Sequence, residues 1–171
     1  VHEMQSRRVL YVAVLLHDIA KGRKGDHSVL GADLAEQLCP RLGFTEDQTE
    51  TVAWLVRHHL LMSNTAFKRD LDDPATIETF ADQVQSMERL RQLLVLTVAD
   101  IRAVGPKTWN GWKAQLLRDL FNRTEEYLSG GLIFAGRERE VDKVLGELKA
   151  KLADWPAEDL AAHLERGHPG Y

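Results

Sequence analysis

The residues best suited to chemistry are a histidine–aspartate pair at the end of an apolar stretch. His17 and Asp18 directly follow the apolar run Val9–Leu16, which is typical of a buried helix. An unpaired carboxylate in a protein core costs several kcal/mol, so the pair needs either an ion-pair partner or a cation. A metal ion would satisfy both residues, because neutral imidazole offers one nitrogen and a carboxylate can bind or bridge ions. The alternative is a histidine stabilised by the dipole at a helix end, with Asp18 at the surface.

Further candidate ligands occur in three other segments. His27 follows the turn after the pair, and Asp100 interrupts a later apolar helix. The adjacent His58 and His59 end another helix. Each of these residues alone is more often a core or helix-end residue, but together they favour one shared site. Nitrogen and oxygen donors without sulfur suit Mg, Mn, Fe(II) or Zn, and the sequence does not choose among them.

The elements that must position these residues are helices. Apolar residues recur at spacings of three and four from end to end, which predicts an all-α fold. Ser28 is expected to cap one helix, and Thr45 with Gln48 fits a capping box that opens another. The polar segment Asn64–Ala75 is predicted to be a mobile connection. The expected helices run from about Arg8 to Lys21, Ser28 to Pro40, Thr45 to Met62, Pro74 onward, Ser86 to Val104, and Trp109 to Leu128, the last with Trp112, Leu116, Leu117, Leu120 and Phe121 facing inward.

The sequence Ser129-Gly130-Gly131 predicts a boundary. It would separate a domain over residues 1–128 from a helical extension over residues 129–171. Because the chain opens on Val1 and an amphipathic segment follows almost at once, we expect a fragment that is truncated at its N-terminus.

Composition narrows the class of protein. An apolar fraction of 44% and a charged fraction of 28% are close to globular averages. The net charge of -4 gives no broad basic field for nucleic acid or anionic lipid. Cys39 is the only cysteine, which excludes an intrachain disulfide and fits a reducing compartment. The longest apolar run is far shorter than the roughly 20 residues of a membrane span, so we expect a cytoplasmic protein without a membrane or nucleic-acid partner.

The pair, the later histidines and the distal aspartate resemble the HD superfamily of phosphohydrolases, which are helical bundles. The resemblance is closer to the uridylyl-removing domain of the bifunctional uridylyltransferase/uridylyl-removing enzymes, the PII uridylyltransferase family, and covers roughly Val9 to Leu128. Five strings carry it: His-Asp-Ile-Ala-Lys-Gly (17–22), Gly-Asp-His-Ser (25–28), His-His-Leu-Leu-Met-Ser (58–63), Leu-Thr-Val-Ala-Asp-Ile (96–101) and Trp-Asn-Gly-Trp-Lys (109–113). The tail resembles the segment that leads to glutamine-sensing ACT domains in that family.

The resemblance implies hydrolysis of the phosphodiester that links UMP to a tyrosine of the PII signal protein, in the service of nitrogen regulation. It also implies control by glutamine through ACT domains, and a divalent metal cofactor, Mg or Mn before Fe or Zn. Asp18 would contact or bridge the ions. The ligands beside it would be His17 with Asp100, and His27 with His58 or His59, of which His59 is the better match to the family string. The ions would lower the pKa of a bound water toward roughly 7 and neutralise charge on the phosphoryl oxygens.

Basic and aromatic residues near these strings have two interpretations. Lys21, one helical turn after His17, is a candidate catalytic residue that would hold a phosphate oxygen, as would Arg23 or Lys24. The alternative is that basic residues simply favour a helix C-terminus. Trp109 and Trp112 would stack on uracil or else belong to the core.

One departure from the family pattern affects the site. HD proteins take a further histidine from a preceding helix, and here only His2 lies upstream. The nucleotidyltransferase signature of the family is also missing, so no transferase activity is predicted. Two other functions therefore stay open: a generic HD nucleotide phosphohydrolase, and a regulatory or PII-binding module that does not catalyse hydrolysis.

Overall fold

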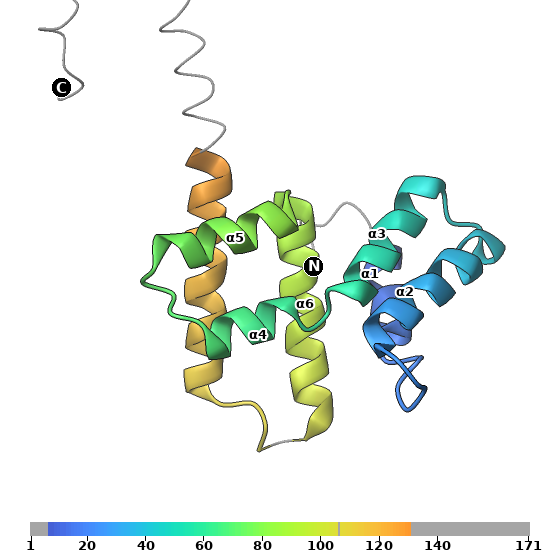
Figure 1. The fold of residues 1–171 in the computed structure, drawn as a ribbon, viewed down its shortest axis with the longest axis horizontal. Coiled ribbons are helices and arrows are strands. Elements are labelled where there is room, and N and C mark those ends of the chain that lie inside the picture. Colours follow the sequence, from blue (N-terminus) through green and yellow to red (C-terminus); the bar gives the residue numbers. More distant parts are fainter. Residues whose placement is uncertain (1–6, 106, 131–171) are drawn as a thin grey trace, which may run out of the picture. The chain divides into compact units, whose positions relative to one another are not determined.

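The computed structural model describes residues 7–105 and 107–130, and within them every regular element is helical, as predicted (Figure 1). The described residues as far as Ser129 belong to one compact unit. The predicted extension helices lie outside the described residues, and the predicted domain boundary stays a prediction. The helices are α1 (Arg7–Leu16), α2 (His27–Leu38), the 3-10 turn η1 (Pro40–Leu42), α3 (Glu46–Arg57), α4 (Leu61–Lys68), α5 (Pro74–Val84), α6 (Met87–Val104) and one over residues 111–130.

Helix α6 is the centre of the bundle. It packs against α1 and α3 on one side and against α4 and α5 on the other (Figure 1). Its residues Leu90, Leu93 and Leu96 are buried, at the spacing of three that places them on one helical face. The helix over residues 111–130 adds Leu117 and Leu120 to the same core. The predicted burial of α6 is therefore confirmed.

Helices α2 and α3 pack closely against each other. A methyl group built on Gly31 of α2 would lie 2.9 Å from Cγ1 of Val56 on α3, so the absence of a side chain at Gly31 permits this approach. Helix α2 begins at His27, and α3 ends two residues before His59. The pairing of these helices thus brings two of the predicted ligands toward each other.

Three predicted helix starts are confirmed. The Thr45 amide donates to Oε1 of Gln48 at 3.1 Å, and the Gln48 amide donates to Oγ1 of Thr45 at 3.3 Å, which completes the capping box of α3. Helix α5 begins at Pro74, and α6 begins directly after its cap Ser86. In each case a capping side chain pairs an amide that the first helical turn leaves without a partner.

Two predictions about the start of the bundle were wrong. Helix α1 ends at Leu16 rather than Lys21, because the chain turns there: the Ile19 amide bonds the Leu16 carbonyl at 3.0 Å, and the Lys21 amide bonds that of Asp18 at 2.9 Å. The cap of α2 is Asp26 rather than Ser28. The Asp26 carboxylate accepts the Ser28 amide at 2.8 Å, so Ser28 already lies in the first turn.

Two further corrections concern later segments. The predicted helix from Thr45 to Met62 is interrupted after Arg57, and α4 (Leu61–Lys68) covers the first part of Asn64–Ala75, which was predicted to be a mobile connection. Trp112 was predicted to face inward, but 62% of it is exposed, and its ring stacks on Phe67 with centroids 6.3 Å apart. Throughout the part of the chain that the structure describes, no helix combines the length and apolar character that a membrane crossing needs.

Candidate metal centre

Asp18 lies in the turn after α1, and its two carboxylate oxygens face different partners. Oδ1 lies 3.7 Å from Nε2 of His27 and 3.9 Å from Nε2 of His59. Oδ2 lies 3.7 Å from Nε2 of His17 and accepts a hydrogen bond from Nζ of Lys21 at 2.7 Å. The Asp18 carboxylate therefore stands between two sets of side chains.

The candidate donors form two groups that share Asp18. One group is Asp18 with His27 and His59, and the other is Asp18 with His17 and Asp100; within each group the donor atoms lie within 4.8 Å of one another. Nε2 of His17 is 3.4 Å from Oδ1 of Asp100, which reaches the site from α6. The structure thus brings together residues that are far apart in the sequence, in the same division around Asp18 that the family resemblance implies. Their role as metal ligands stays a prediction.

Backbone carbonyls fix the orientation of two histidine rings. Nδ1 of His17 lies 2.8 Å from the Val14 carbonyl, and Nδ1 of His59 lies 2.7 Å from the Val56 carbonyl. A carbonyl oxygen only accepts, so Nδ1 is the donor in both rings, and in a neutral ring Nε2 keeps its lone pair. Sequence reasoning did not find these two carbonyls, because every residue has one and only the local chain path selects them.

His59 is the most deeply buried member of the site, with 1% of its side chain exposed. Burial lowers the pKa of the His59 imidazole, the neighbouring His17 and His27 rings lower it further, and the Val56 carbonyl and Asp18 counteract them in part. The ring is therefore neutral at neutral pH. Its Nε2 lone pair faces Asp18 Oδ1, which is also an acceptor.

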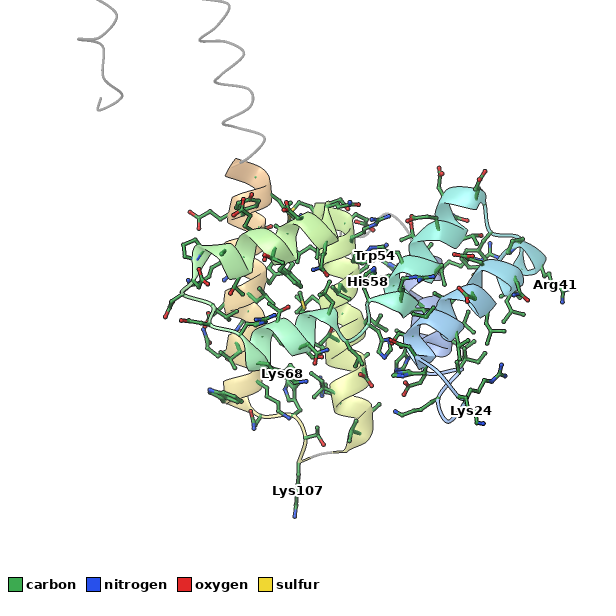
Figure 2. The ribbon with its side chains drawn as sticks, viewed as in Figure 1. Lys24, Arg41, Trp54, His58, Lys68 and Lys107 are labelled. Carbon is green, nitrogen blue, oxygen red and sulfur yellow. The ribbon has the colours of Figure 1, made fainter. Side chains whose placement is uncertain are left out.

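The other member of the adjacent histidine pair, His58, does not join the site. Its ring packs against Trp54 with centroids 4.9 Å apart (Figure 2). Burial lowers the pKa of His58, as do the positive charges of Arg57 and Arg89. Among the predicted metal residues, His58 is the one that the structure places elsewhere.

The donors fit divalent cations. With metal–ligand bonds of about 2.1 Å, two ligands of one ion lie between about 3.0 Å apart at right angles and about 4.2 Å apart in line. The nitrogen–oxygen separations of 3.4 to 3.9 Å around Asp18 fall within this range. A cation would also resolve the contact between the two acceptors His59 Nε2 and Asp18 Oδ1, which face each other without a proton between them.

The Lys21 side chain contacts the Asp18 carboxylate. Burial raises the pKa of the Asp18 carboxyl, but the hydrogen bond from Lys21 and the electrostatic interactions with His17, Lys21 and His59 outweigh it and hold this pKa below its usual value. The same hydrogen bond raises the pKa of Lys21. Lys21 is 71% exposed, and Arg23 and Lys24 are exposed in the turn that follows, so this side of the site carries positive charge toward solvent.

An all-helical bundle with two donor groups around one aspartate is what an HD-type phosphohydrolase domain has, and HD domains bind divalent metals. Residues 2–103 match the family described as "HD domain", and the chain belongs to this family.

The relatives of the chain are more specific. It is 63% identical over 171 residues to the bifunctional uridylyltransferase/uridylyl-removing enzyme of Azospirillum brasilense, and 57% identical over 171 residues to that of Rhodospirillum rubrum. The enzyme of the same name from Gluconobacter oxydans is 55% identical over 170 residues. The first two alignments cover 100% of the chain and the third 99%, and each covers 18% of the relative, so the chain spans about a fifth of the length of these enzymes. No solved structure matches the chain. The resemblance predicted from the sequence strings is confirmed.

Proposed function

We propose that this domain removes UMP from uridylylated PII by hydrolysing the phosphodiester to a tyrosine. The observation that carries the proposal is the position of Asp18, whose two oxygens serve two donor groups at once. A shared carboxylate of this kind is suited to hold two cations side by side. The names of the relatives support the choice of a uridylyl group as the one removed.

The chain's own residues have separate tasks in this proposal. Asp18, His27 and His59 would hold one cation, and Asp18, His17 and Asp100 a second. Bound divalent cations, which we propose to be Mn or Mg, would neutralise charge on the phosphoryl oxygens and lower the pKa of a coordinated water. The carbonyls of Val14 and Val56 keep the Nε2 atoms of His17 and His59 directed at the site.

Lys21 has a positioning task and a candidate binding task. Its Nζ holds Oδ2 of Asp18, which limits rotation of the carboxylate that both donor groups share. With 71% of its side chain exposed, the same ammonium group can also donate to a phosphate oxygen that approaches from solvent. The Lys21 ammonium would then bridge the substrate and Asp18.

The reaction balances with water as the only co-substrate. The oxygen of water bonds to phosphorus, the bond from phosphorus to the tyrosine oxygen breaks, and the proton lost by the water reaches the tyrosine oxygen through solvent, so the products are UMP and PII with an unmodified tyrosine. Because a phenol has a pKa of about 10, the tyrosine oxygen leaves with little help from a general acid.

The test is metal-dependent release of UMP from uridylylated PII by the 171-residue chain, after stripping with a chelator and addition of Mn or Mg. Free nucleotides and bis(p-nitrophenyl) phosphate serve as comparison substrates. We expect UMP release from PII, and a loss of more than about 10²-fold in Asp18→Asn and His59→Gln, since a metal site supplies several kcal/mol of transition-state stabilisation. His58→Gln is the matched control, because it changes the adjacent histidine that lies outside both donor groups.

Two results would contradict the proposal. Hydrolysis confined to free nucleotides would indicate a generic nucleotide phosphohydrolase. Binding of PII without turnover under any added metal would indicate a regulatory module.

A further inference from the structure

A groove whose lining is separate from the candidate metal ligands lies between α4 and α5. These helices form an antiparallel hairpin (Figure 1), and the groove between them has a volume of about 430 Å³. Small-molecule sites usually measure roughly 300–1,000 Å³. None of the candidate metal ligands lines this groove. The groove is therefore large enough for a ligand of its own.

Two cations, Lys68 and Arg69, line the groove at the end of α4. Nζ of Lys68 donates to the neutral amide oxygen of Asn64 at 2.8 Å. Within residues 7–105 and 107–130, no carboxylate oxygen lies within 4.0 Å of the charged nitrogens of Lys68 or Arg69. Lysine and arginine in a concave site without an anionic partner favour an anionic ligand.

The carboxylates of the nearby loop have other partners. Asp73 lines the groove, but its Oδ1 accepts the Ala75 amide at 3.0 Å and so caps α5. Asp72 pairs with Arg123 at 2.6 Å, and Asp70 accepts the Asp72 amide at 2.9 Å. These contacts orient the loop carboxylates without removing their charge, so the charged described residues that line the groove are the two cations Lys68 and Arg69 and the one carboxylate Asp73.

The rest of the lining suits a ligand rich in acceptor oxygens. Thr65 of α4 and Thr76 of α5 line the groove, and neither hydroxyl donates a hydrogen bond to another described residue. Phe80, which is 1% exposed, and Leu61 provide an apolar floor. A small molecule with a carboxylate or phosphate group and a short apolar body would match both kinds of surface.

We infer that the α4–α5 groove binds a small oxyanion, through the charges of Lys68 and Arg69 and the hydroxyl groups of Thr65 and Thr76. The inference does not depend on the proposed uridylyl-removing reaction. A ligand there would tie α4 to α5. Helix α4 begins two residues after His59, so the ligand would also stabilise the segment that carries this histidine.

The test is a titration of the isotope-labelled 171-residue chain, followed by amide chemical shifts at constant ionic strength. The probes are succinate and inorganic phosphate, with the neutral succinamide as a control of similar shape. We expect shift changes confined to α4 and α5 with at least one of the two anions and none with succinamide. Whichever anion binds more tightly identifies the favoured headgroup.

Two variants with equal charge changes make the test specific. Lys68→Gln with Arg69→Gln should weaken binding about tenfold or more, because both charge-assisted hydrogen bonds are lost. Arg41→Gln with Lys107→Gln removes the same charge from exposed positions on other elements and should leave the affinity unchanged (Figure 2). Thr76→Val should weaken binding severalfold without any change in charge.

A second readout is thermal unfolding, since a ligand that binds only the folded chain raises its midpoint. The stabilisation by the anion should disappear in the Lys68→Gln, Arg69→Gln variant and persist in the Arg41→Gln, Lys107→Gln variant. The inference is overturned if neither anion shifts the α4 and α5 amides, if succinamide acts as strongly as succinate, or if both double variants lose binding equally.

Discussion

Replacing Gly31 with alanine tests how the α2–α3 pair positions the metal centre. The added methyl would lie 2.9 Å from Cγ1 of Val56, whereas non-bonded carbons normally lie about 3.5–4.0 Å apart. Val56 is fully buried and β-branched, so its side chain cannot rotate away within a helix. The two helices must therefore separate locally by about 0.6 Å or more.

The expected loss of stability in Gly31→Ala is the difference between two opposing effects. Overpacking of a tight contact costs about 1–3 kcal/mol. Alanine in place of glycine within a helix stabilises the folded chain by about 0.5–1 kcal/mol. Gly111→Ala is the matched control, since no atom lies within 4 Å of a methyl built there. We expect Gly31→Ala to be less stable than Gly111→Ala by about 1–3 kcal/mol in urea unfolding of the metal-free chain followed by circular dichroism.

The same displacement should weaken metal binding. His27 is the first residue of α2, and the Val56 carbonyl on α3 anchors His59, so separating the helices separates two donors of one group. Loss of supporting geometry around a metal site typically costs about 10–100-fold in affinity, and we expect Mn binding measured by calorimetry to fall in that range.

A double-mutant cycle with Val56→Ala decides the cause. Removing Cγ1 makes room for the new methyl, so the double variant should be more stable than the sum of the single changes predicts, by about 1 kcal/mol or more. If Gly31→Ala is as stable as Gly111→Ala and the cycle is additive, the close approach of α2 and α3 is not what positions His27 and His59.

Three further predictions address the fold and the site. Thr45→Ala should destabilise the chain by about 1 kcal/mol through loss of the capping box, and Thr51→Ala, whose hydroxyl bonds a carbonyl within the helix, by less than about 0.5 kcal/mol; equal effects would contradict the capping role. Burial raises the pKa of the Cys39 thiol, so a thiol-specific disulfide reagent at neutral pH should react slowly with the native chain and rapidly in urea, and a fast native reaction would refute this burial. Asp18→Ala and Asp100→Ala should each abolish hydrolysis while the helical circular dichroism spectrum persists, whereas unfolding of both would identify them as structural residues.

The existence of the helices could be predicted from the sequence, but several of their ends could not. Apolar spacing identified α6, the capping box of Thr45 and Gln48 identified the start of α3, and Pro74 identified the start of α5, because these signals are local. The C-terminal ends of α1 and α3 carry no glycine or proline at the point where they stop. Each helix ends instead near a histidine, His17 or His59, whose ring bonds a carbonyl of the last turn. Whether this bond forms depends on the side chains that surround the ring in the bundle, and these are distant in the sequence.

Which of His58 and His59 enters the site also depends on where the helix before them ends. Neighbouring residues on a helix point about 100° apart, so which imidazole enters the site depends on where α3 ends. A helix extended to Met62, as predicted, leaves both residues as candidates. In the structure α3 ends at Arg57, which leaves His58 on Trp54 and directs His59 inward beside Asp18. Trp112 was misplaced for a related reason, because periodicity alone does not show which apolar side chain has a partner beyond its own helix.

In His17 and His59 one side chain both pairs a carbonyl at a helix end and is a candidate metal ligand. The last carbonyls of a helix have no intrahelical partner. At α1 the Val14 carbonyl is paired by His17, and at α3 the Val56 carbonyl is paired by His59, in each case three residues along the chain. His27 belongs to the same donor group as His59, and within the described part of the chain its ring donates to no backbone carbonyl. His59→Gln should therefore destabilise even the metal-free chain, by about 1–3 kcal/mol, because it leaves a buried carbonyl unpaired. His27→Gln should weaken Mn binding with little effect on metal-free stability. Equal metal-free stability of the two variants would show that the carbonyl contact only orients the ring and does not help to end the helix.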